Sequence, residues 1–398
     1  MSEYKISRFT LVEPLSGNGL GLFNTLTRAL GGLPAEVWNT ATSGQDQDTA
    51  EELAVQGFLV DRDQDEDQVL AHWRTSMAYD LTTLTYLVSP TRACNMACSY
   101  CIHGSRKRSE HMSSETARAV LDFIQADVEI KRPKTVRLDF GGAEAILNPN
   151  VMVYLAEGLY RFCRGRGLEF KVSLISNGLA LTPDLIKELK KFGLVKVRVT
   201  VSGVAETHDR LRPAKDGGPT YDRIMGNLAA LAGLVEIGLQ GQYDPGNGDY
   251  RTFPKLLDEL TDKGLRDHLS DVSFGPFLPV GNDAQLWDDP PTGPIDCLVE
   301  EDPRRYLWLQ EQIRQRGFKE VSGPPVSRCL ANYRNNVIID VAGGLGVCPS
   351  MMDHTELNYG QVRTGVDFRL EARLLVRNLP DFCRQECCLA PLCDGGCR

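Results

Sequence analysis

Short apolar runs alternate with amphipathic segments between residues 84 and 277. The runs have the length and the β-branched composition of buried strands, and the segments between them carry apolar residues at helical spacing. This alternation predicts a parallel sheet with helices packed outside it. Strands are expected at 84–90, 135–140, 170–176, 195–203, 235–243 and 271–277, and helices at 113–128, 150–165, 183–193, 221–234 and 253–264.

The number of strand–helix units limits the architecture. Six expected strands fall short of the eight that close a (β/α) barrel. The chain is therefore expected to be an α/β protein with a partial (β/α)6 TIM-like barrel, open on one side, over residues 81–282. In such barrels the chemistry lies at the C-terminal ends of the strands.

The segments on either side of the barrel follow different patterns. Residues 1–80 are expected to form a small α+β module, with two short strands around SGNGLG and helices at 23–33 and 49–60. The Asn-Gly pair inside SGNGLG favours a hairpin turn because both residues accept positive φ. The stretch 281–294 is rich in Gly, Pro and Asp and predicts a boundary. Residues 295–398 are expected to form a separate domain that something other than a large apolar core holds together.

Charge and composition exclude several classes of protein. The chain has 398 residues, a net charge of -9 and a pI near 5.3, which argues against nucleic acid or an acidic membrane surface as a partner. No signal peptide and no apolar run of about 18 residues is present, so a cytoplasmic location is expected. Thiols stay reduced there, and the twelve clustered cysteines therefore indicate a chemistry other than disulfides.

The stretch RACNMACSYCIHG, residues 92–104, places Cys94, Cys98 and Cys101 on a loop after the first barrel strand. Three interpretations compete. The first is a set of buried, inert thiols, which is disfavoured because side chains at this spacing on a loop converge. The second is a zinc site with His103 as the fourth donor. The third is a four-iron cluster with one iron left open, since clusters that only carry electrons use four thiolates.

Cys94, Cys98, Tyr100 and Cys101 match the CxxxCxxC signature of radical S-adenosylmethionine enzymes, with its aromatic residue before the third cysteine. The chain resembles that family, whose signature follows the first strand of a partial (β/α)6 barrel. The resemblance implies a [4Fe–4S] cluster held by the three cysteines, with S-adenosylmethionine on the open iron. It also implies reductive cleavage of this cofactor to a 5′-deoxyadenosyl radical that abstracts hydrogen from an unactivated carbon.

Three further stretches resemble cofactor-binding elements of the family. FGGAEAILNPN, from residue 140, resembles the glycine-rich motif after the second strand, although its glutamate falls one place late. ISNGLAL resembles the element that lies near the ribose, and VTVSGVAETHDRLR the element whose arginine pairs with the cofactor carboxylate, with Ser202 in place of the usual aspartate. Through this resemblance, cofactor contacts are expected from Tyr100, Gly141, Gly142, Glu144, Asn177, Thr200 and Arg212.

The C-terminal cysteines resemble those of the SPASM domain, which holds one or two further four-iron clusters. The resemblance implies Cys329, Cys348 and Cys397 as ligands of an inner cluster, and Cys383, Cys387 and Cys393 as ligands of an outer one. Each set is one donor short.

The missing donors leave several possibilities open. One possibility is that Cys388 or Cys297 supplies a fourth ligand. The other two are that an iron stays open to substrate or that the outer cluster is absent. A zinc knuckle in the last nineteen residues is the alternative without iron. Cys163 lies on the apolar face of an expected helix and is predicted to be a core residue.

Enzymes with a SPASM domain act mostly on peptides or proteins. The resemblance therefore implies a maturase of a ribosomally made precursor peptide, whose leader binds residues 1–80 by adding a strand or lying along a helix. An electron donor such as flavodoxin or ferredoxin is the second expected partner. The choice between crosslinking, epimerisation and backbone excision stays open, and Asp340, Asp353 and His354 are the nearby candidates for a general base.

Two alternative functions remain. Sulfatase maturation is disfavoured because more than ninety residues precede Cys94 and because Pro349, not an aspartate, follows Cys348. A quinone-cofactor maturase is a related alternative, and a non-catalytic iron–sulfur protein is an alternative from another class.

Overall fold

The structure, a computed structural model, describes residues 3–103, 109–277, 302–321, 329–352, 354–375 and 378–395. The chain divides into two compact units. Unit 1 comprises residues 1–80, 324–333 and 375–398, and unit 2 comprises residues 81–323 and 334–374. The domain limits expected from the sequence stay predictions, because this division groups residues by their contacts and not by independent folding.

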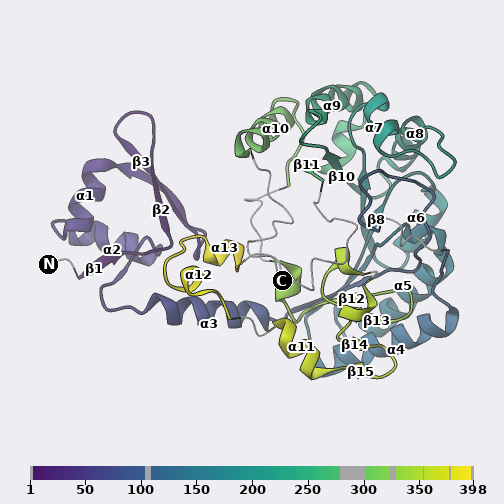
Figure 1. The fold of residues 1–398 in the computed structure, drawn as a ribbon, viewed down its shortest axis with the longest axis horizontal. Helices are drawn as coiled ribbons and strands as arrows, with labels where there is room; N and C mark the ends of the chain where they lie inside the picture. The colour runs from purple at the N-terminus through teal and green to yellow at the C-terminus, as the bar shows by residue number, and fades with distance from the viewer. Residues whose placement is uncertain are drawn as a thin grey trace. The chain divides into compact units, whose positions relative to one another are not determined.

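Six parallel strands follow one another in sequence order across the sheet of unit 2 (Figure 1). They are β6 (Thr83–Val88), β7 (Thr135–Phe140), β8 (Glu169–Ser176), β9 (Leu194–Thr200), β10 (Glu236–Tyr243) and β11 (Leu269–Pro276). All six expected strands are confirmed, with ends that differ by a few residues. Among the described strands the barrel does not close, since β6 pairs with β7 and β12 whereas β11 pairs with β10.

Helices follow the strands and cover the outer side of the sheet (Figure 1). The five expected helices are confirmed as α4 (Ser114–Lys131), α5 (Pro149–Arg164), α6 (Pro183–Lys190), α8 (Tyr221–Leu231) and α9 (Phe253–Asp262). Side-chain oxygens of Ser113 and Thr182 cap α4 and α6, since each accepts a backbone N–H of the first turn. Additional segments are α7 (Ala205–Leu211), α10 (Pro303–Gln315) and the 3₁₀ turns η2 (Ala145–Leu147), η3 (Asp249–Thr252) and η4 (Arg266–His268).

Alternation along the strands separates an apolar outer face from a polar inner face. Val136, Leu138 and Phe140 of β7 are fully buried in the main core, between the sheet and the helices. The residues between them, Arg137 and Asp139, point to the opposite face because successive strand residues alternate. The core therefore lies outside the barrel sheet. Cys163 belongs to that core and is fully buried, as the sequence predicts.

The segment after the barrel extends the same sheet. Strand β12 (Asn336–Ile339) pairs in parallel with β6, and β13 (Gly344–Gly346), β14 (Gly360–Gln361) and β15 (Gly365–Val366) continue antiparallel from it. All four residues of β12 are buried, so this strand covers the edge that β6 would otherwise expose. The 3₁₀ turns η6 (Leu330–Asn332), η7 (Pro349–Met351) and η8 (Thr355–Leu357) and helix α11 (Phe368–Leu375) complete this region.

Unit 1 contains a three-stranded antiparallel sheet of β2 (Thr10–Pro14), β3 (Gly19–Asn24) and β4 (Leu30–Pro34), together with a pair formed by β1 (Tyr4–Ile6) and β5 (Leu59–Asp61). Three helices accompany them, α1 (Ala35–Ser43), α2 (Gln47–Val55) and α3 (Glu66–Ala78). The hairpin around SGNGLG is confirmed, because β2 pairs with β3 across it.

The helix expected at 23–33 is wrong. The Asn24 side chain accepts the N–H groups of Leu26 and Thr27, both at 2.9 Å, and this local bonding favours a turn over a helix. Arg28 then adopts a positive φ of 66°. The chain reverses there, and β4 pairs with β3.

The C-terminal segment of unit 1 packs on its N-terminal part. Phe9 and Leu70 form one buried cluster with Leu379 and Ala390. Helices α12 (Asp381–Gln385) and α13 (Ala390–Cys393) lie in this segment, and α12 contacts α3.

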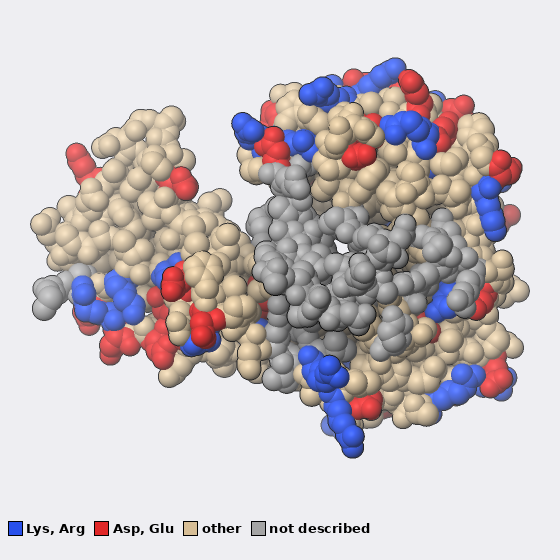
Figure 2. Space-filling view, viewed as in Figure 1, with Lys and Arg blue, Asp and Glu red and all other residues tan. Residues whose placement is uncertain are grey.

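The described surface shows no strong separation of charge on the face that Figure 2 presents, where basic and acidic side chains are interspersed. That face therefore has no extended positive field to attract a polyanion. No helix in the described ranges has the length and apolar character needed to cross a bilayer.

Candidate functional site

Residues 92–103, here called the triplet loop, follow β6 at the C-terminal ends of the barrel strands. The segment after α7 holds this loop through backbone hydrogen bonds. Ala97 donates its N–H to the carbonyl of Pro213 at 2.9 Å, and Ser99 donates to the carbonyl of Leu211 at 3.0 Å. Because α7 follows the fourth barrel strand, two sites distant in sequence are fixed against each other at one end of the barrel.

Cys94, Cys98 and Cys101 are half-buried in the triplet loop. Within the part of the chain that is described, no three His, Cys, Asp or Glu side chains are gathered in the arrangement of a metal site. The assignment of these thiols as cluster ligands therefore stays a prediction, which rests on their spacing and on their neighbours.

Asn177 ties the third strand to the triplet loop. Its side-chain nitrogen donates to Oδ1 of Asn95 at 2.7 Å and lies 3.7 Å from Sγ of Cys94. Its Oδ1 accepts the N–H of Leu179 at 2.9 Å. Asn177 thus lies beside the first cysteine, and the contact with the ribose expected from the sequence stays a prediction.

Glu144 is buried and contacts both the end of β8 and the start of the triplet loop. Its carboxylate accepts the Ser176 hydroxyl at 2.8 Å and the Asn177 N–H at 2.7 Å, and its own N–H donates to the Ala93 carbonyl at 3.1 Å. Burial raises its pKa to about 7, although the hydrogen bonds from Asn177 and Ser176 oppose this shift. In this structure Glu144 fastens the loop after β8 to the loop after β7, so a direct cofactor contact stays a prediction.

The two glycines after β7 meet different constraints. Gly142 has φ of +102°, and a Cβ there would lie 2.2 Å from Oγ of Ser89. A Cβ at Gly141 would meet nothing closer than 3.7 Å. Only Gly142 is therefore required by the packing of the protein itself, and Gly141 leaves room for a close approach by a ligand.

Tyr100, Ser202 and Arg212 form one group, here called the tyrosine network, in which Ser202 and Arg212 are buried and Tyr100 is half-buried. The Tyr100 hydroxyl lies 2.9 Å from the Ser202 hydroxyl and accepts a hydrogen bond from Nη1 of Arg212 at 2.7 Å. The Tyr100 ring stacks on Phe277, with 4.0 Å between the ring centroids. The network therefore orients the aromatic residue of the CxxxCxxC motif.

Arg212 places a positive charge beside the thiols. Burial works to lower its pKa, but Tyr100, Cys98 and Cys94 raise it above its usual value. Its Nε is buried and has no hydrogen-bond partner among the described residues. Buried donors are normally paired, so this atom indicates a missing acceptor such as a carboxylate.

Thr200 and Ser202 bind different neighbours, and a cofactor contact from Thr200 stays a prediction. The Thr200 hydroxyl is buried and accepts the side-chain N–H of Gln240 at 2.9 Å, so it supports the neighbouring strand. Ser202, noted in the sequence only as a replacement, is the hydroxyl that contacts Tyr100. Its position in the SGxxExHD stretch is the signal that could have identified it.

Sequence reasoning also missed His208. Its ring is fully buried, and Nδ1 accepts the N–H of Ser202 at 3.1 Å. Burial, and then the charge of Arg212, lower its pKa to about 3. The imidazole is therefore neutral at any ordinary pH.

The C-terminal cysteines are spread over both units. Cys383 and Cys387 pack against the buried cluster of unit 1, Cys388 is half-buried and Cys393 is exposed. Cys329 belongs to unit 1 and Cys348 to unit 2, and each immediately precedes a 3₁₀ turn. Cys297 and Cys397 lie outside the described residues.

The candidates for a general base differ in their surroundings. The Asp340 carboxylate accepts hydrogen bonds from Ala342, Gly344 and Asn358, which fixes the turn between β12 and β13. Asp340 is thereby occupied as a structural acceptor. His354 is half-buried, and Asp353 lies outside the described residues.

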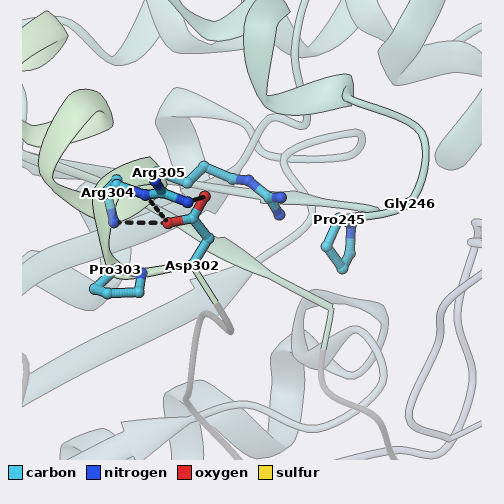
Figure 3. A pocket seen from close by; sticks show the side chains of 6 residues that line it. All are labelled: Pro245, Gly246, Asp302, Pro303, Arg304 and Arg305. Atoms are coloured by element: carbon cyan, nitrogen blue, oxygen red, sulfur yellow. Dashed lines mark hydrogen bonds and ion pairs between the residues drawn. The ribbon is translucent and has the colours of Figure 1, made fainter.

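A cavity of about 520 Å³ lies beyond the C-terminal end of β10 (Figure 3). Its described lining comes from the loop after β10 and the start of α10, namely Pro245, Gly246, Asp302, Pro303, Arg304 and Arg305. Asp302 and Arg304 form an ion pair there. None of these described lining residues belongs to the triplet loop or to the tyrosine network.

The residues present fit a four-iron cluster and S-adenosylmethionine. Three thiols supply the soft donors that such a cluster takes. Arg212 offers an unpaired, buried N–H to a carboxylate, and the backbone at Gly141 is open to close approach.

Comparisons with known proteins agree with this chemistry. Residues 88–239 match the family model described as the radical SAM superfamily. The chain is 24% identical over 273 residues to the mycofactocin maturase MftC of Mycolicibacterium smegmatis, an alignment that covers 65% of this chain and 62% of that protein. The chain thus spans less than two thirds of the length of this curated relative.

Two solved structures share the fold. The structure of native anSMEcpe with bound AdoMet matches with a TM-score of 0.57 at 16% identity, over 79% of this chain and 89% of that chain. Streptococcus suis SuiB bound to the precursor peptide SuiA matches with a TM-score of 0.54 at 13% identity, over 99% of this chain and 95% of that chain. The partial barrel expected from the sequence is therefore confirmed. Residues 88–239 thus match the radical S-adenosylmethionine superfamily, a family that binds a [4Fe–4S] cluster and S-adenosylmethionine.

Proposed function

We propose that this protein is a radical S-adenosylmethionine maturase that modifies a ribosomally made precursor peptide. The observation that carries the proposal is the convergence of Asn177 and the tyrosine network on the triplet loop. Asn177 follows β8, Ser202 follows β9, and Tyr100 lies in the loop after β6. Asn177 lies beside a thiol, and Ser202 and Arg212 contact Tyr100, the aromatic residue between two of the cysteines. The bound cofactors supply one-electron cleavage of a sulfonium and hydrogen abstraction from carbon.

The residues of this chain would hold and orient the cofactors. Cys94, Cys98 and Cys101 would bind three irons of the cluster. Arg212 would pair with the carboxylate of S-adenosylmethionine through its unpaired Nε, and the backbone at Gly141 would receive the amino group. Tyr100, fixed by its hydroxyl and by Phe277, would limit the movement of the bound nucleotide.

A peptide substrate is supported by the relatives and by unit 1. MftC is named as a maturase, and SuiB was solved with a precursor peptide. In the described part of unit 1, β4 pairs only with β3 and carries an exposed Leu30. An extended leader would add to this open edge through backbone hydrogen bonds. Flavodoxin or ferredoxin would deliver the electron.

Cleavage of S-adenosylmethionine tests the proposal. The protein, reconstituted with iron and sulfide under anaerobic conditions and reduced with dithionite, is expected to convert S-adenosylmethionine to 5′-deoxyadenosine. A Cys98→Ala variant is expected to lose this activity, whereas Cys163→Ala is expected to keep it because Cys163 lies in the core, away from the loop. Absence of 5′-deoxyadenosine from the wild-type protein with a full complement of iron would leave an iron–sulfur carrier as the better description.

The peptide is identified by a second measurement. We expect a short reading frame beside this gene to encode the precursor peptide. Incubation of the enzyme with that peptide is expected to change the mass of the peptide. Deletion of residues 3–34 is expected to abolish the mass change without abolishing formation of 5′-deoxyadenosine. A modified small molecule in place of a modified peptide would contradict the proposed substrate class.

A further inference from the structure

The polar residues of the HDRLR stretch each bind a different element of unit 2. The Asp209 carboxylate accepts the N–H groups of Thr220 and Tyr221 at the start of α8. Arg210 pairs with Asp249 of η3. Arg212 reaches the triplet loop through Tyr100. This short stretch therefore contacts three other parts of unit 2, and His208 is its remaining polar member.

His208 satisfies a backbone group that the sheet leaves unpaired. After β9 ends at Thr200, Val201 still donates its N–H to the carbonyl of Gln240. The next N–H, that of Ser202, donates instead to Nδ1 of His208 at 3.1 Å. Because Nδ1 accepts, the proton of the neutral ring is on Nε2. Nε2 is buried and has no hydrogen-bond partner in the described part of the chain.

Ser202 connects His208 to Tyr100, the aromatic residue between the second and third cysteines. Its N–H is held by His208, and its hydroxyl lies 2.9 Å from the Tyr100 hydroxyl. Tyr100 in turn accepts the hydrogen bond from Arg212 at 2.7 Å. These contacts connect the buried imidazole of His208 to the guanidinium of Arg212, which lies near Cys94 and Cys98.

We propose that His208 is a positioning residue for S-adenosylmethionine, acting through Ser202 to fix Tyr100 and Arg212. This inference rests on the proposed function, since it assigns a role in binding the same cofactor. His208 itself touches neither the thiols nor the reacting atoms. If its acceptor is lost, the buried N–H of Ser202 is left unsatisfied, and the cost is relieved by displacement of residues 201–203.

The competing explanation is that His208 only fills space. Its ring packs edge-on against Tyr221, with 5.7 Å between the centroids, which is ordinary aromatic packing. The two explanations differ in what a substitution must preserve. Packing needs volume at the ring position, whereas positioning needs an acceptor where Nδ1 now lies.

The variants His208→Asn and His208→Gln separate these needs. The Asn side chain places its oxygen near the position of Nδ1 and can still accept from Ser202. The Gln side chain is closer to His in volume, but its amide extends to the position of Nε2. Both side chains are neutral and polar, so burying them is expected to lower the stability of the protein by similar amounts. Ser202→Ala is a third variant that leaves His208 in place and removes the hydroxyl contact with Tyr100.

The experiment follows the electron paramagnetic resonance spectrum of the reduced, reconstituted protein as S-adenosylmethionine is added. His208→Gln is expected to raise the half-saturating concentration about tenfold, because one buried donor loses its partner. His208→Asn is expected to remain within about threefold of wild type, and Ser202→Ala to follow His208→Gln. Iron content and the maximal rate of 5′-deoxyadenosine formation are expected to stay near wild type.

The outcomes distinguish this inference from the proposed function. Equal half-saturating concentrations in Asn, Gln and wild-type proteins would overturn the role of His208 and leave the function standing. A larger defect in Asn than in Gln would assign His208 to packing. A wild-type spectrum that does not respond to S-adenosylmethionine would remove both the function and the inference.

Discussion

At the scale of single residues, the site depends on buried polar groups whose charge state burial controls. Glu144 and His208 are both fully buried. Burial disfavours the charged form of each, so the pKa of the carboxyl rises to about 7 and that of the imidazole falls to about 3. Both groups therefore act through hydrogen bonds of fixed direction more than through charge.

Glu144 gives a pH-dependent prediction. Its pKa is about 7 in the folded protein and 4.5 in its ordinary state, so the folded protein retains a proton that the unfolded chain has lost. The contribution of Glu144 to stability is then greatest below pH 4.5 and is lost as the pH rises to 7, by up to about 3 kcal/mol. Glu144→Gln cannot ionise. We expect the unfolding temperature of the wild type, compared with that of this variant, to decrease as the pH rises from 5 to 7.5.

The measurement is thermal unfolding under anaerobic conditions, followed by tryptophan fluorescence at several pH values. The titration of His208 affects both proteins equally and cancels in the difference. Glu206→Gln, an exposed carboxylate on α7, is the control and is expected to show a difference that does not change with pH. A constant difference for Glu144→Gln as well would show that this carboxyl has an ordinary pKa.

At the scale of elements, the barrel could be predicted and its additions could not. Strands such as β7 are buried on the outer face and bounded by helices, so a local pattern reports them. The residues of β4 read as a helix because their pairing with β3, and not their own propensity, decides their structure. Strand β12 has its partner β6 far earlier in the sequence, and no local signal indicates that pairing.

The same reasoning explains which site residues could be found. The cysteine triplet and Arg212 belong to motifs whose spacing is visible in the sequence. Ser202 and His208 act through a backbone N–H and a hydroxyl, and such contacts appear only when β9, α7 and the triplet loop are brought together. Glu144 belongs to a motif visible in the sequence, but the direction of its carboxylate, toward Ser176, depends on the fold.

The docking of the C-terminal segment on α3 gives a prediction at the scale of elements. Nε of Arg74 lies 2.5 Å from the carboxylate of Asp394, whose side chain is only 1% exposed. Arg74→Ala would leave this buried carboxylate without its cation, at a cost of about 3 to 5 kcal/mol. We expect hydrogen exchange in residues 378–395 to accelerate strongly. Arg384→Ala, which removes a 43% exposed side chain from the same segment, is the control and is expected to have little effect.

Equal acceleration by both substitutions would mean that the buried pair contributes no more than a surface one. No acceleration by either would mean that the apolar cluster around Leu70 and Leu379 holds the segment alone.

At the scale of the whole molecule, the chain passes between its two units repeatedly. The N-terminal 80 residues and the last 24 belong to unit 1, although the barrel lies between them in sequence. Most of the C-terminal cysteines are therefore grouped with the proposed leader-binding module, and the cysteine triplet is grouped with the barrel. The proposed leader-binding module and the residues matched by the radical SAM model thus belong to separate units of one chain.

Because each unit has a buried apolar cluster of its own, we expect the two units to differ in their local free energies of unfolding. Leu70 is buried in a cluster formed only by unit 1, and Leu155 is buried in the core of unit 2. Truncation of either leucine to alanine leaves a cavity that costs about 2 to 5 kcal/mol. If the units are stabilised independently, Leu70→Ala will accelerate hydrogen exchange in α3 and in residues 378–395 and will leave β7 and α5 unchanged. Leu155→Ala will do the reverse. Acceleration across both units by either substitution would show that the molecule unfolds as one cooperative body, and leader recognition could then not be weakened without weakening the barrel.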